Sequence, residues 1–231
     1  MIGPQDQRMP ASGSSVGGRQ LHIATAQELG LLAQSLAEAF EEDPIFSWLM
    51  PDQRTRLARL RRFYLIELRY VALAAGRAWT ERGLAGAAIT APPHSWRLPL
   101  RAMLRQAPLF GAHVHRAALL LSAVEMHHPR TPHWYFAHIG VRPQDQGRGL
   151  GSALMRPTLD HCDSEGLPAY LEASSERSAA LYQRLGFQLI RELSVLRSPP
   201  LRLMIRPCQR WIEPRAHPAQ ACPHPSEARA G

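Results

Sequence analysis

Three glycines in alternating positions mark the point where a strand-like segment gives way to a helix-like one. The aromatic, β-prone stretch 134–141 precedes them and the helix-prone stretch 152–165 follows, with Gly147, Gly149 and Gly151 in between. Such a junction exposes several backbone N–H groups at the positive end of a helix dipole, with no Cβ to hold an anion away. The feature therefore predicts a strand-to-helix turn that binds a phosphorylated ligand.

Two better-known kinds of glycine loop do not match this pattern. The phosphate loop of nucleotide hydrolases ends in Gly-Lys-Ser/Thr and is excluded, because the chain contains no lysine. The dinucleotide fingerprint needs glycines at its first, third and sixth positions, but counting from Gly147 the sixth position is Ser152. A plain turn that binds nothing remains an alternative, although such a turn seldom needs three glycines, because each costs backbone entropy.

The residues around these glycines resemble the acyl-coenzyme A signature of the GNAT acetyltransferases, Gln/Arg-x-x-Gly-x-Gly/Ala. Gln146, Gly149 and Gly151 fill its defined positions. Stretches 168–174 and 181–187 resemble the next strand and the following helix of that superfamily. Within it the chain is most similar to the puromycin N-acetyltransferase-like branch, which also has a proline where Pro157 interrupts the helix after the loop. The resemblance covers about residue 20 to about residue 207.

One domain is the default for 231 residues. We expect an N-terminal tail at 1–19, a GNAT acetyltransferase domain at 20–208 and a flexible tail rich in Pro, Arg and His at 209–231. The fold class is α/β, with a mixed, mostly antiparallel central sheet and helices on both faces, as the resemblance implies.

Hydrophobic periodicity and turn residues predict the order of elements along the domain. They are a strand at 21–24, a helix at 27–41, a helix from Asp52 to a C-cap at Gly76, hairpin strands at 77–81 and 84–90, an apolar helical region at 98–126 interrupted at Pro108 and Gly111, a strand at 134–141, a helix at 152–165, a strand at 169–173, a helix from Ser175 to Leu185, and a terminal hairpin of 189–195 with 201–206.

Composition excludes several other classes of protein. The net charge of +8 comes from 27 arginines against 19 acids, but the arginines are scattered or recur at helical spacing, so no nucleic-acid partner is expected. Cys162, Cys208 and Cys222 are odd in number and unevenly spaced, which predicts neither a disulfide framework nor a zinc site. His127, His128, His133 and His138 lack metal-ligand spacing, so no metal is expected.

The expected location is the cytoplasm. The N-terminal stretch lacks the apolar core of a signal peptide, and no run approaches the ~20 apolar residues of a membrane span. We therefore expect a soluble protein without a membrane partner, and the sequence leaves monomer and homodimer open.

The resemblance implies that acetyl-CoA is the co-substrate. Its pyrophosphate is expected on the N–H groups of the loop, where Arg148 can add a charge-assisted contact. The pantetheine arm is expected on the main chain at the end of the preceding strand, where a backbone N–H would also stabilise the oxyanion. The implied cofactor-binding residues are Ile139, Gly140, Val141, Gln146, Gly147, Arg148, Gly149, Leu150, Gly151 and Ser152.

Glu172 and Tyr182 are the catalytic candidates. Glu172 is the only acid in the apolar strand 169–173, where the resemblance places a general base; the alternative is an edge-strand acid paired with an arginine. Tyr182 matches the family's general acid beside the coenzyme A sulfur; the alternative is a packing residue against Phe187. Many relatives carry an asparagine at the start of this helix, where this chain has Ser175 and Ser178.

The resulting hypothesis is an N-acetyltransferase that moves the acetyl group of acetyl-CoA to a primary amine of a small molecule, by direct attack in a ternary complex. Two alternatives are a protein or peptide N-acetyltransferase with an open groove, and a non-catalytic acyl-CoA-binding regulatory module. The region 98–126 is expected to shape an amine pocket or to add core packing. The sequence does not identify the acceptor amine.

Overall fold

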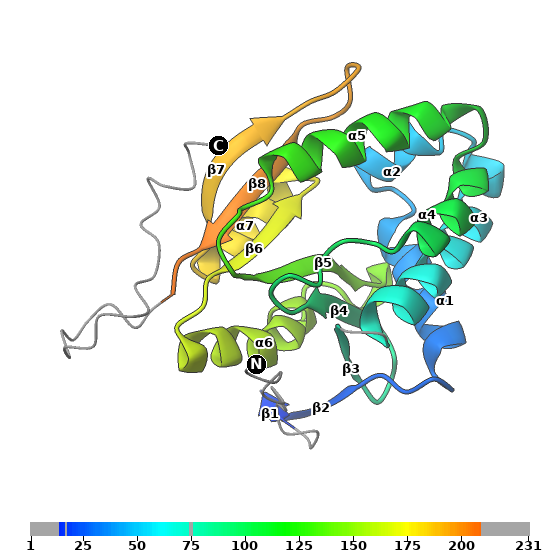
Figure 1. The fold of residues 1–231 in the computed structure, drawn as a ribbon. Coiled ribbons are helices and arrows are strands. Elements are labelled where there is room, and N and C mark those ends of the chain that lie inside the picture. Colours follow the sequence, from blue (N-terminus) through cyan, green and yellow to red (C-terminus); the bar gives the residue numbers. More distant parts are fainter. Residues whose placement is uncertain (1–13, 17, 74–75, 209–231) are drawn as a thin grey trace, which may run out of the picture.

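The fold is described by a computed structural model, which covers residues 14–16, 18–73 and 76–208. One eight-stranded sheet forms its centre, in the order β1-β2-β3-β4-β5-β6-β8-β7. All neighbouring strands are antiparallel except β5 and β6, which are parallel. Helices cover both faces (Figure 1), which confirms the predicted fold class.

The elements follow the predicted order with three additions, β1, α2 and η3. Their bounds are β1 Ser14–Val16, β2 Arg19–Ile23, α1 Leu29–Phe40, α2 Pro44–Leu49, α3 Gln53–Glu67, η1 Leu68–Ala72, β3 Arg77–Glu81, β4 Gly86–Ala91, α4 Leu100–Gln106, η2 Ala107–His113, α5 Val114–His127, β5 Trp134–Val141, η3 Pro143–Asp145, α6 Leu150–Glu165, β6 Ala169–Ala173, α7 Glu176–Arg184, β7 Gln188–Leu193 and β8 Leu201–Arg206.

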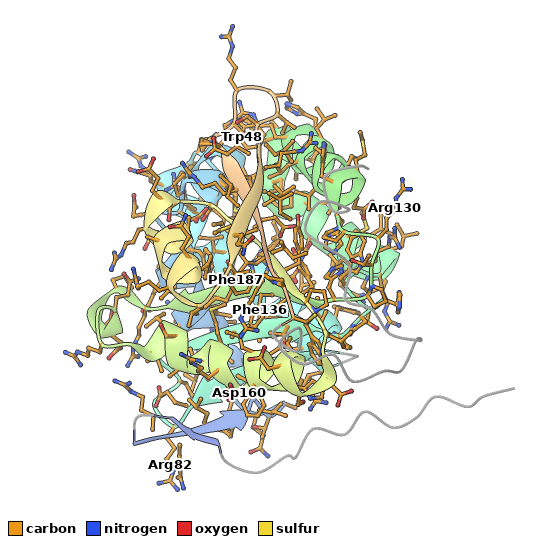
Figure 2. All side chains as sticks on the ribbon, turned by 90° about the vertical axis from the view of Figure 1, so that its left-hand side faces the viewer. Trp48, Arg82, Arg130, Phe136, Asp160 and Phe187 are labelled. Atoms are coloured by element: carbon orange, nitrogen blue, oxygen red, sulfur yellow. The ribbon has the colours of Figure 1, made fainter. Side chains whose placement is uncertain are left out.

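Strand β4 shows why both faces of the sheet need helices. Every residue of β4 is buried, as expected for a strand covered on both sides. Ala87 and Ile89 belong to the core formed with α1 and α3, whereas Ala88 packs with Leu150 and Leu154 of α6. A further cluster between β5, β6, α6 and α7 includes Phe136 and Phe187, which lie near each other inside the molecule (Figure 2).

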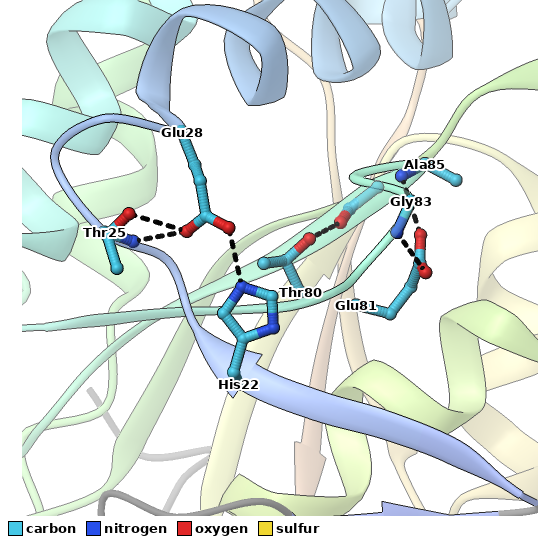
Figure 3. Close-up of polar contacts among 8 residues, drawn as sticks. His22, Thr25, Glu28, Thr80, Glu81, Gly83 and Ala85 are labelled. Carbon is cyan, nitrogen blue, oxygen red and sulfur yellow. Dashed lines mark hydrogen bonds and ion pairs between the residues drawn. The ribbon is translucent and has the colours of Figure 1, made fainter.

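Polar contacts fix the first connections of the chain (Figure 3). The Glu28 carboxylate accepts hydrogen bonds from the N–H and hydroxyl of Thr25 and pairs with His22. The Glu81 carboxylate accepts from the N–H groups of Gly83 and Ala85 and so holds the turn between β3 and β4. The predicted hairpin around Arg82-Gly83 is confirmed.

The helix after Asp52 ends differently from the prediction. Helix α3 passes into a π-helical turn, η1, which ends at Ala72. Gly76 does not have the positive φ of a helix C-cap, so that interpretation is wrong. A Cβ on Gly76 would lie 2.1 Å from the carbonyl oxygen of Thr90. The glycine therefore allows close contact with β4.

The region 98–126 forms helices α4 and α5, joined by η2. Gly111, with φ 54° and ψ −131°, breaks the helix as predicted. One 18-residue window within the segment Leu100–His127 has a mean hydropathy of 1.2, so this segment could cross a membrane by length and composition. The sequence-based expectation did not include such a window, because it combines short apolar stretches on both sides of the break at Gly111.

Three further observations differ from the sequence-based expectations. Cys162 is free and buried, but Cys208 is disulfide-bonded, so the prediction that the cysteines form no disulfide is wrong for Cys208. Strand β1 lies inside the expected N-terminal tail; the rest of that tail to residue 13, and the tail at 209–231, lie outside the described residues. Helix α6 continues through Pro157 without interruption.

Candidate active site

The two parallel strands at the centre of the sheet separate from each other. Strand β5 has eight residues, but only Trp134, Tyr135 and Phe136 pair with β6. Directly after Phe136 the pairing of β5 with β4 shifts by one residue, which leaves Ala137 as a bulge. A bulge bends a strand and increases its twist, and here it turns the second half of β5 away from β6.

The second half of β5 directs backbone groups into the resulting opening. Arg142 donates its N–H to the carbonyl of Ala85 on the β4 side, at 2.9 Å. Because neighbouring residues of a strand alternate in direction, Val141 and Ile139 direct their N–H and C=O groups away from β4. Gly140 allows α1 to pack closely against β5, because a Cβ at this position would lie 2.6 Å from Cε2 of Phe40.

The glycine loop closes one end of the opening. Gly147 and Gly149 both have φ 76°, a left-handed conformation that favours glycine, and Gly149 is the N-cap of α6. The Gln146 side chain donates to the carbonyl of Val141 at 2.8 Å and so ties the loop to β5. The unpaired N–H groups of the first turn of α6 form an anion site at the end of the opening.

One large cavity of about 1480 Å³ follows from this divergence. It extends from the glycine loop and α7, past β5 and β6, to helices α1 to α5. Most of its lining is apolar, but its charged lining is acidic in a chain with a net charge of +8. The acids are Glu38, Glu41, Glu42, Asp43, Glu67, Glu125, Asp145 and Glu172, and the cationic residues are Arg177 and Arg184.

The predicted cofactor residues meet at this cavity, except for Arg148. Ile139, Gly140, Val141, Gln146, Gly147, Gly149, Leu150, Gly151 and Ser152 all line it. Arg148 instead lines a small neighbouring cavity with Arg19, and its side chain is 69% exposed. The Arg148 side chain therefore does not line the main cavity, and its phosphate contact stays a prediction. Arg177 and Arg184 on α7, which we did not predict, are the arginines that the main cavity offers.

Glu172 is buried on the cavity wall. Its side chain is 8% exposed, and its Oε2 accepts a hydrogen bond of 2.8 Å from the hydroxyl of Tyr135. Its Oε1 is buried, and the hydroxyl of Tyr170 is a second side-chain donor to this carboxylate. Burial raises the pKa of Glu172 to about 7, against the opposing effect of the Tyr135 hydrogen bond. Strand β6 lies between β5 and β8, so Glu172 is not the edge-strand acid of the alternative interpretation.

Tyr182 lies on α7 and also lines the cavity. It is buried, its ring centroid is 6.0 Å from that of Phe187, and burial followed by the charge of Asp43 raises its hydroxyl pKa. The side chain thus packs against Phe187 and contributes to the cavity wall. Its high pKa keeps the hydroxyl protonated at neutral pH, as a proton donor requires.

The serines at the start of α7 cap the helix. The Ser175 hydroxyl accepts from the Ser178 N–H, and the Ser178 hydroxyl accepts from the Ser175 N–H, each at 3.2 Å. Next to them, Ser174 donates to the carboxylate of Asp43, which also accepts from two N–H groups at the start of α2. These contacts hold α2 beside the end of β6.

A second buried carboxylate, Glu67, was not predicted. Burial raises its pKa to about 7, Gln106 donates to its Oε1 at 2.5 Å, and its Oε2 lies 3.8 Å from Nε2 of His138. Burial also lowers the pKa of His138 to about 4, so its ring is neutral. A lone acid in the apolar stretch 63–68 was the available signal, the same one that identified Glu172.

A histidine pair lies on the far side of Glu172. His128 stacks on Trp96, with ring centroids 3.6 Å apart, and both residues line the cavity. Nε2 of His128 lies 2.9 Å from Nε2 of His133, and Nδ1 of His128 lies 3.9 Å from Oε1 of Glu172. The described part of the chain has no group of three or more potential metal ligands.

The geometry agrees with a family comparison. The model of the "Acetyltransferase (GNAT) family" matches residues 33–187, which is more than half of the chain. The chain belongs to the GNAT acetyltransferase family. The matched residues of this GNAT protein include the bulge at which β5 diverges from β6, the glycine loop and the start of α6.

Curated relatives match over short stretches. An uncharacterized N-acetyltransferase of Schizosaccharomyces pombe is 37% identical over 76 residues, which is 32% of this chain and 31% of the relative. A mycothiol acetyltransferase of Paenarthrobacter aurescens is 43% identical over 67 residues, 26% of this chain and 21% of the relative. The matched stretches thus span less than a third of these relatives.

Solved structures agree over the whole domain. A structure described as histone acetyltransferase HPA2 and related acetyltransferase from Corynebacterium glutamicum has a TM-score of 0.66 and 26% identity, covering 84% of this chain and 98% of that one. A mosquito arylalkylamine N-acetyltransferase like 5b, at 16% identity and a TM-score of 0.51, covers 81% and 98% and shares the fold. The narrower puromycin N-acetyltransferase-like branch stays a prediction.

Proposed function

We propose that the protein transfers the acetyl group of acetyl-CoA to a primary amine of a small molecule, by direct attack while both substrates are bound. The observation that carries the proposal is the one large cavity that both the glycine loop and Glu172 line. Because the proposed acetyl-CoA site and the base Glu172 line the same cavity, the acceptor nitrogen can attack the thioester directly. No acyl-enzyme intermediate is then needed.

The donor binds through the backbone. The pyrophosphate lies on the N–H groups of the first turn of α6, with Arg177 and Arg184 available to neutralise its charge. The pantetheine arm pairs with Ile139 and Val141, whose N–H and C=O groups have no strand partner on that side. An N–H at this strand end faces the thioester oxygen and stabilises the oxyanion.

The proton transfers use two buried groups. The Glu172 carboxylate takes one proton from the ammonium, and the resulting amine attacks the thioester carbon and forms the C–N bond. The tetrahedral intermediate loses the second nitrogen proton to solvent through the cavity as the C–S bond breaks. Tyr182 protonates the leaving thiolate and recovers its proton from solvent, and Glu172 releases its proton to solvent, so that an ammonium and acetyl-CoA give an amide, coenzyme A and one proton.

The cavity itself favours a small amine over a peptide. Its acidic lining attracts a cation even though the chain is basic, and residues of helices α4 and α5 line its apolar part. A peptide would need a groove open at both ends. A regulatory module that only binds acyl-CoA would not need a buried carboxylate at the strand divergence, because burial of such a group destabilises the fold.

The test is coenzyme A release over a panel of small primary amines, among them 2-phenylethylamine and 1,4-diaminobutane, together with lysine-bearing peptides. We expect turnover with at least one small amine and none with the peptides. Tight acetyl-CoA binding without turnover on any acceptor would instead support the regulatory module, and turnover on peptides alone would support the protein acetyltransferase.

A further inference from the structure

Helix α4 is oriented unusually with respect to the core. It buries Ala102 and Gln106, and the Gln106 amide donates to Oε1 of Glu67 at the end of α3. Its leucines lie on another side: Leu100 and Leu104 are 68% and 65% exposed, and both line the main cavity. A helix normally turns its leucines to the core and its glutamine to solvent. Here the polar residue attaches α4 to α3, and the leucines stay available to a ligand.

Helix α5 turns a continuous apolar face to the same cavity. The residues of this face recur at helical spacing and are Val114, Ala117, Ala118, Leu121 and Val124. Of the 14 residues of α5, Leu120 alone is buried, so the core does not enclose this face. Both helices therefore have apolar surface that the described part of the chain leaves uncovered. Such surface marks the binding site of a ligand or partner.

The segment that contains α4 and α5 begins and ends beside Glu172. Trp96 precedes α4 and His128 follows α5, and their rings stack with centroids 3.6 Å apart. Nδ1 of His128 lies 3.9 Å from Oε1 of Glu172. The apolar face of α5 therefore leads away from Glu172, from Val124 to Val114. This face is about 15 Å long at ~1.5 Å per residue, roughly the length of an extended twelve-carbon chain.

We propose that the apolar faces of α4 and α5 bind the hydrocarbon chain of the acceptor, which is a long-chain primary alkylamine with its amino group at the Glu172 end of the cavity. This inference rests on the proposed acetyltransferase function and names its substrate class. The cavity volume of about 1480 Å³ exceeds the roughly 300–1,000 Å³ of a pocket for one small ligand, so there is room for both substrates.

An alkylamine matches both kinds of surface that meet in this cavity. The apolar faces of α4 and α5 share the cavity with the acids Glu67, Glu125 and Glu172, so a hydrocarbon site is continuous with a site for a cation. The alkyl chain gains free energy by leaving water, and the ammonium group is attracted to the acids. An anionic membrane surface would match the leucines but would be repelled by these carboxylates.

The experiment uses n-alkylamines from butylamine to decylamine. Isothermal titration calorimetry without acetyl-CoA gives their affinity, and coenzyme A release gives kcat/KM. A fully buried methylene contributes a factor of about four, so we expect affinity and kcat/KM to rise about two- to fourfold per methylene. We expect 1-octanol to bind more weakly than octylamine, because the alcohol has no charge for the acidic lining to attract.

Two variants remove apolar surface from the proposed chain site. Leu100→Gln and Leu104→Gln change exposed positions to a residue that also favours helices, so the fold should tolerate both. We expect kcat/KM for decylamine to fall about five- to tenfold in each, and kcat/KM for the shorter butylamine to stay constant. Leu31, which is 67% exposed on α1 and does not line the cavity, provides the matched control Leu31→Gln, which should change neither value.

The two hypotheses fail in different ways. An affinity that does not change with chain length, or equal losses in Leu104→Gln and Leu31→Gln, would overturn the alkylamine site while acetyl transfer to short amines stands. Length-dependent binding without turnover on any amine would support the site and refute the acetyltransferase proposal. Binding to phosphatidylglycerol vesicles, or a dimer, that is lost in Leu104→Gln while chain length has no effect would assign the apolar faces to a membrane or to a second copy of the chain.

Discussion

The part of the cavity that we propose for acetyl-CoA, the donor half, and the part that we propose for the amine, the acceptor half, are built from different parts of the chain. The donor half consists of β5, the glycine loop and the start of α6, which are consecutive in sequence and present backbone groups. The acceptor half consists of side chains from α1 to α5 and from β5 and β6. A backbone site can be encoded by a short local motif, whereas a side-chain site depends on how distant elements pack.

The two halves also differ in their electrostatics. The donor half offers the N–H groups of the first turn of α6, which suit an anion, and Arg177 and Arg184 of the separate helix α7 line the same cavity. The acceptor half contains Glu67 and Glu172, each with a pKa raised by burial to about 7. The donor half therefore costs the fold little, while the acceptor half keeps carboxylates in an environment that penalises their charge. Each prediction below changes one half and leaves the other as a control.

The largest effect is expected from Glu172→Gln, which removes the base from the acceptor half. We expect kcat/KM for the amine to fall by about 10² to 10⁴, the range for a positioned general base, with the acetyl-CoA dissociation constant unchanged. Steady-state rates and isothermal titration give the two quantities. Glu176→Gln, at an acid that is 89% exposed on α7, is the matched control. Equal losses in both variants would show that Glu172 has no special role.

An intermediate effect is expected on stability from Glu67→Gln. The folded pKa of about 7 lies above the ordinary value of 4.5 for a glutamate, so the folded state holds the proton more tightly, and stability falls as pH rises from 4.5 to 7. Glutamine has no charge to bury and should raise the free energy of unfolding at pH 8 by about 1 to 3 kcal/mol. Below pH 4.5 that gain should vanish. Chemical denaturation at both pH values measures it, and an equal gain at both would refute the pKa argument.

The smallest effect is expected in the donor half, from Gly149→Ala. Alanine at φ 76° carries strain of roughly 1–2 kcal/mol, which distorts the N-terminus of α6. We expect the acetyl-CoA dissociation constant to rise about tenfold, with the KM for the amine unchanged. Gly18 has the same φ and open space around it, so Gly18→Ala introduces the same strain away from the cavity. An equal loss of affinity in both variants would indicate general destabilisation.

The same contrast explains how much the sequence could reveal. The bounds of β5 and β6 were predicted correctly, because aromatic and aliphatic runs flanked by turn residues are local signals. The loop glycines were also recognised, since their conformation depends on neighbouring residues. The position of Arg148 outside the main cavity was not predictable. Its neighbour there is Arg19, which is distant in sequence and whose side chain donates to the Arg148 carbonyl.

The acceptor half was only partly predictable for the same reason. Glu172 was identified because an acid in an apolar strand is unusual. His128 was dismissed, because its significance comes from Trp96, His133 and Glu172, which reach it from different segments. Gly76 was interpreted as a helix cap because it follows a helical stretch. Its actual role, close contact with the Thr90 carbonyl, involves a strand that is distant in sequence and gives no local signal.

The central claim is that both halves belong to one cavity and are occupied together. Initial rates measured with acetyl-CoA and the amine both varied test it most directly. The structure predicts double-reciprocal lines that intersect, as for attack within a ternary complex. Parallel lines, together with acetylated protein trapped in the absence of amine, would show an acyl-enzyme route and contradict the account.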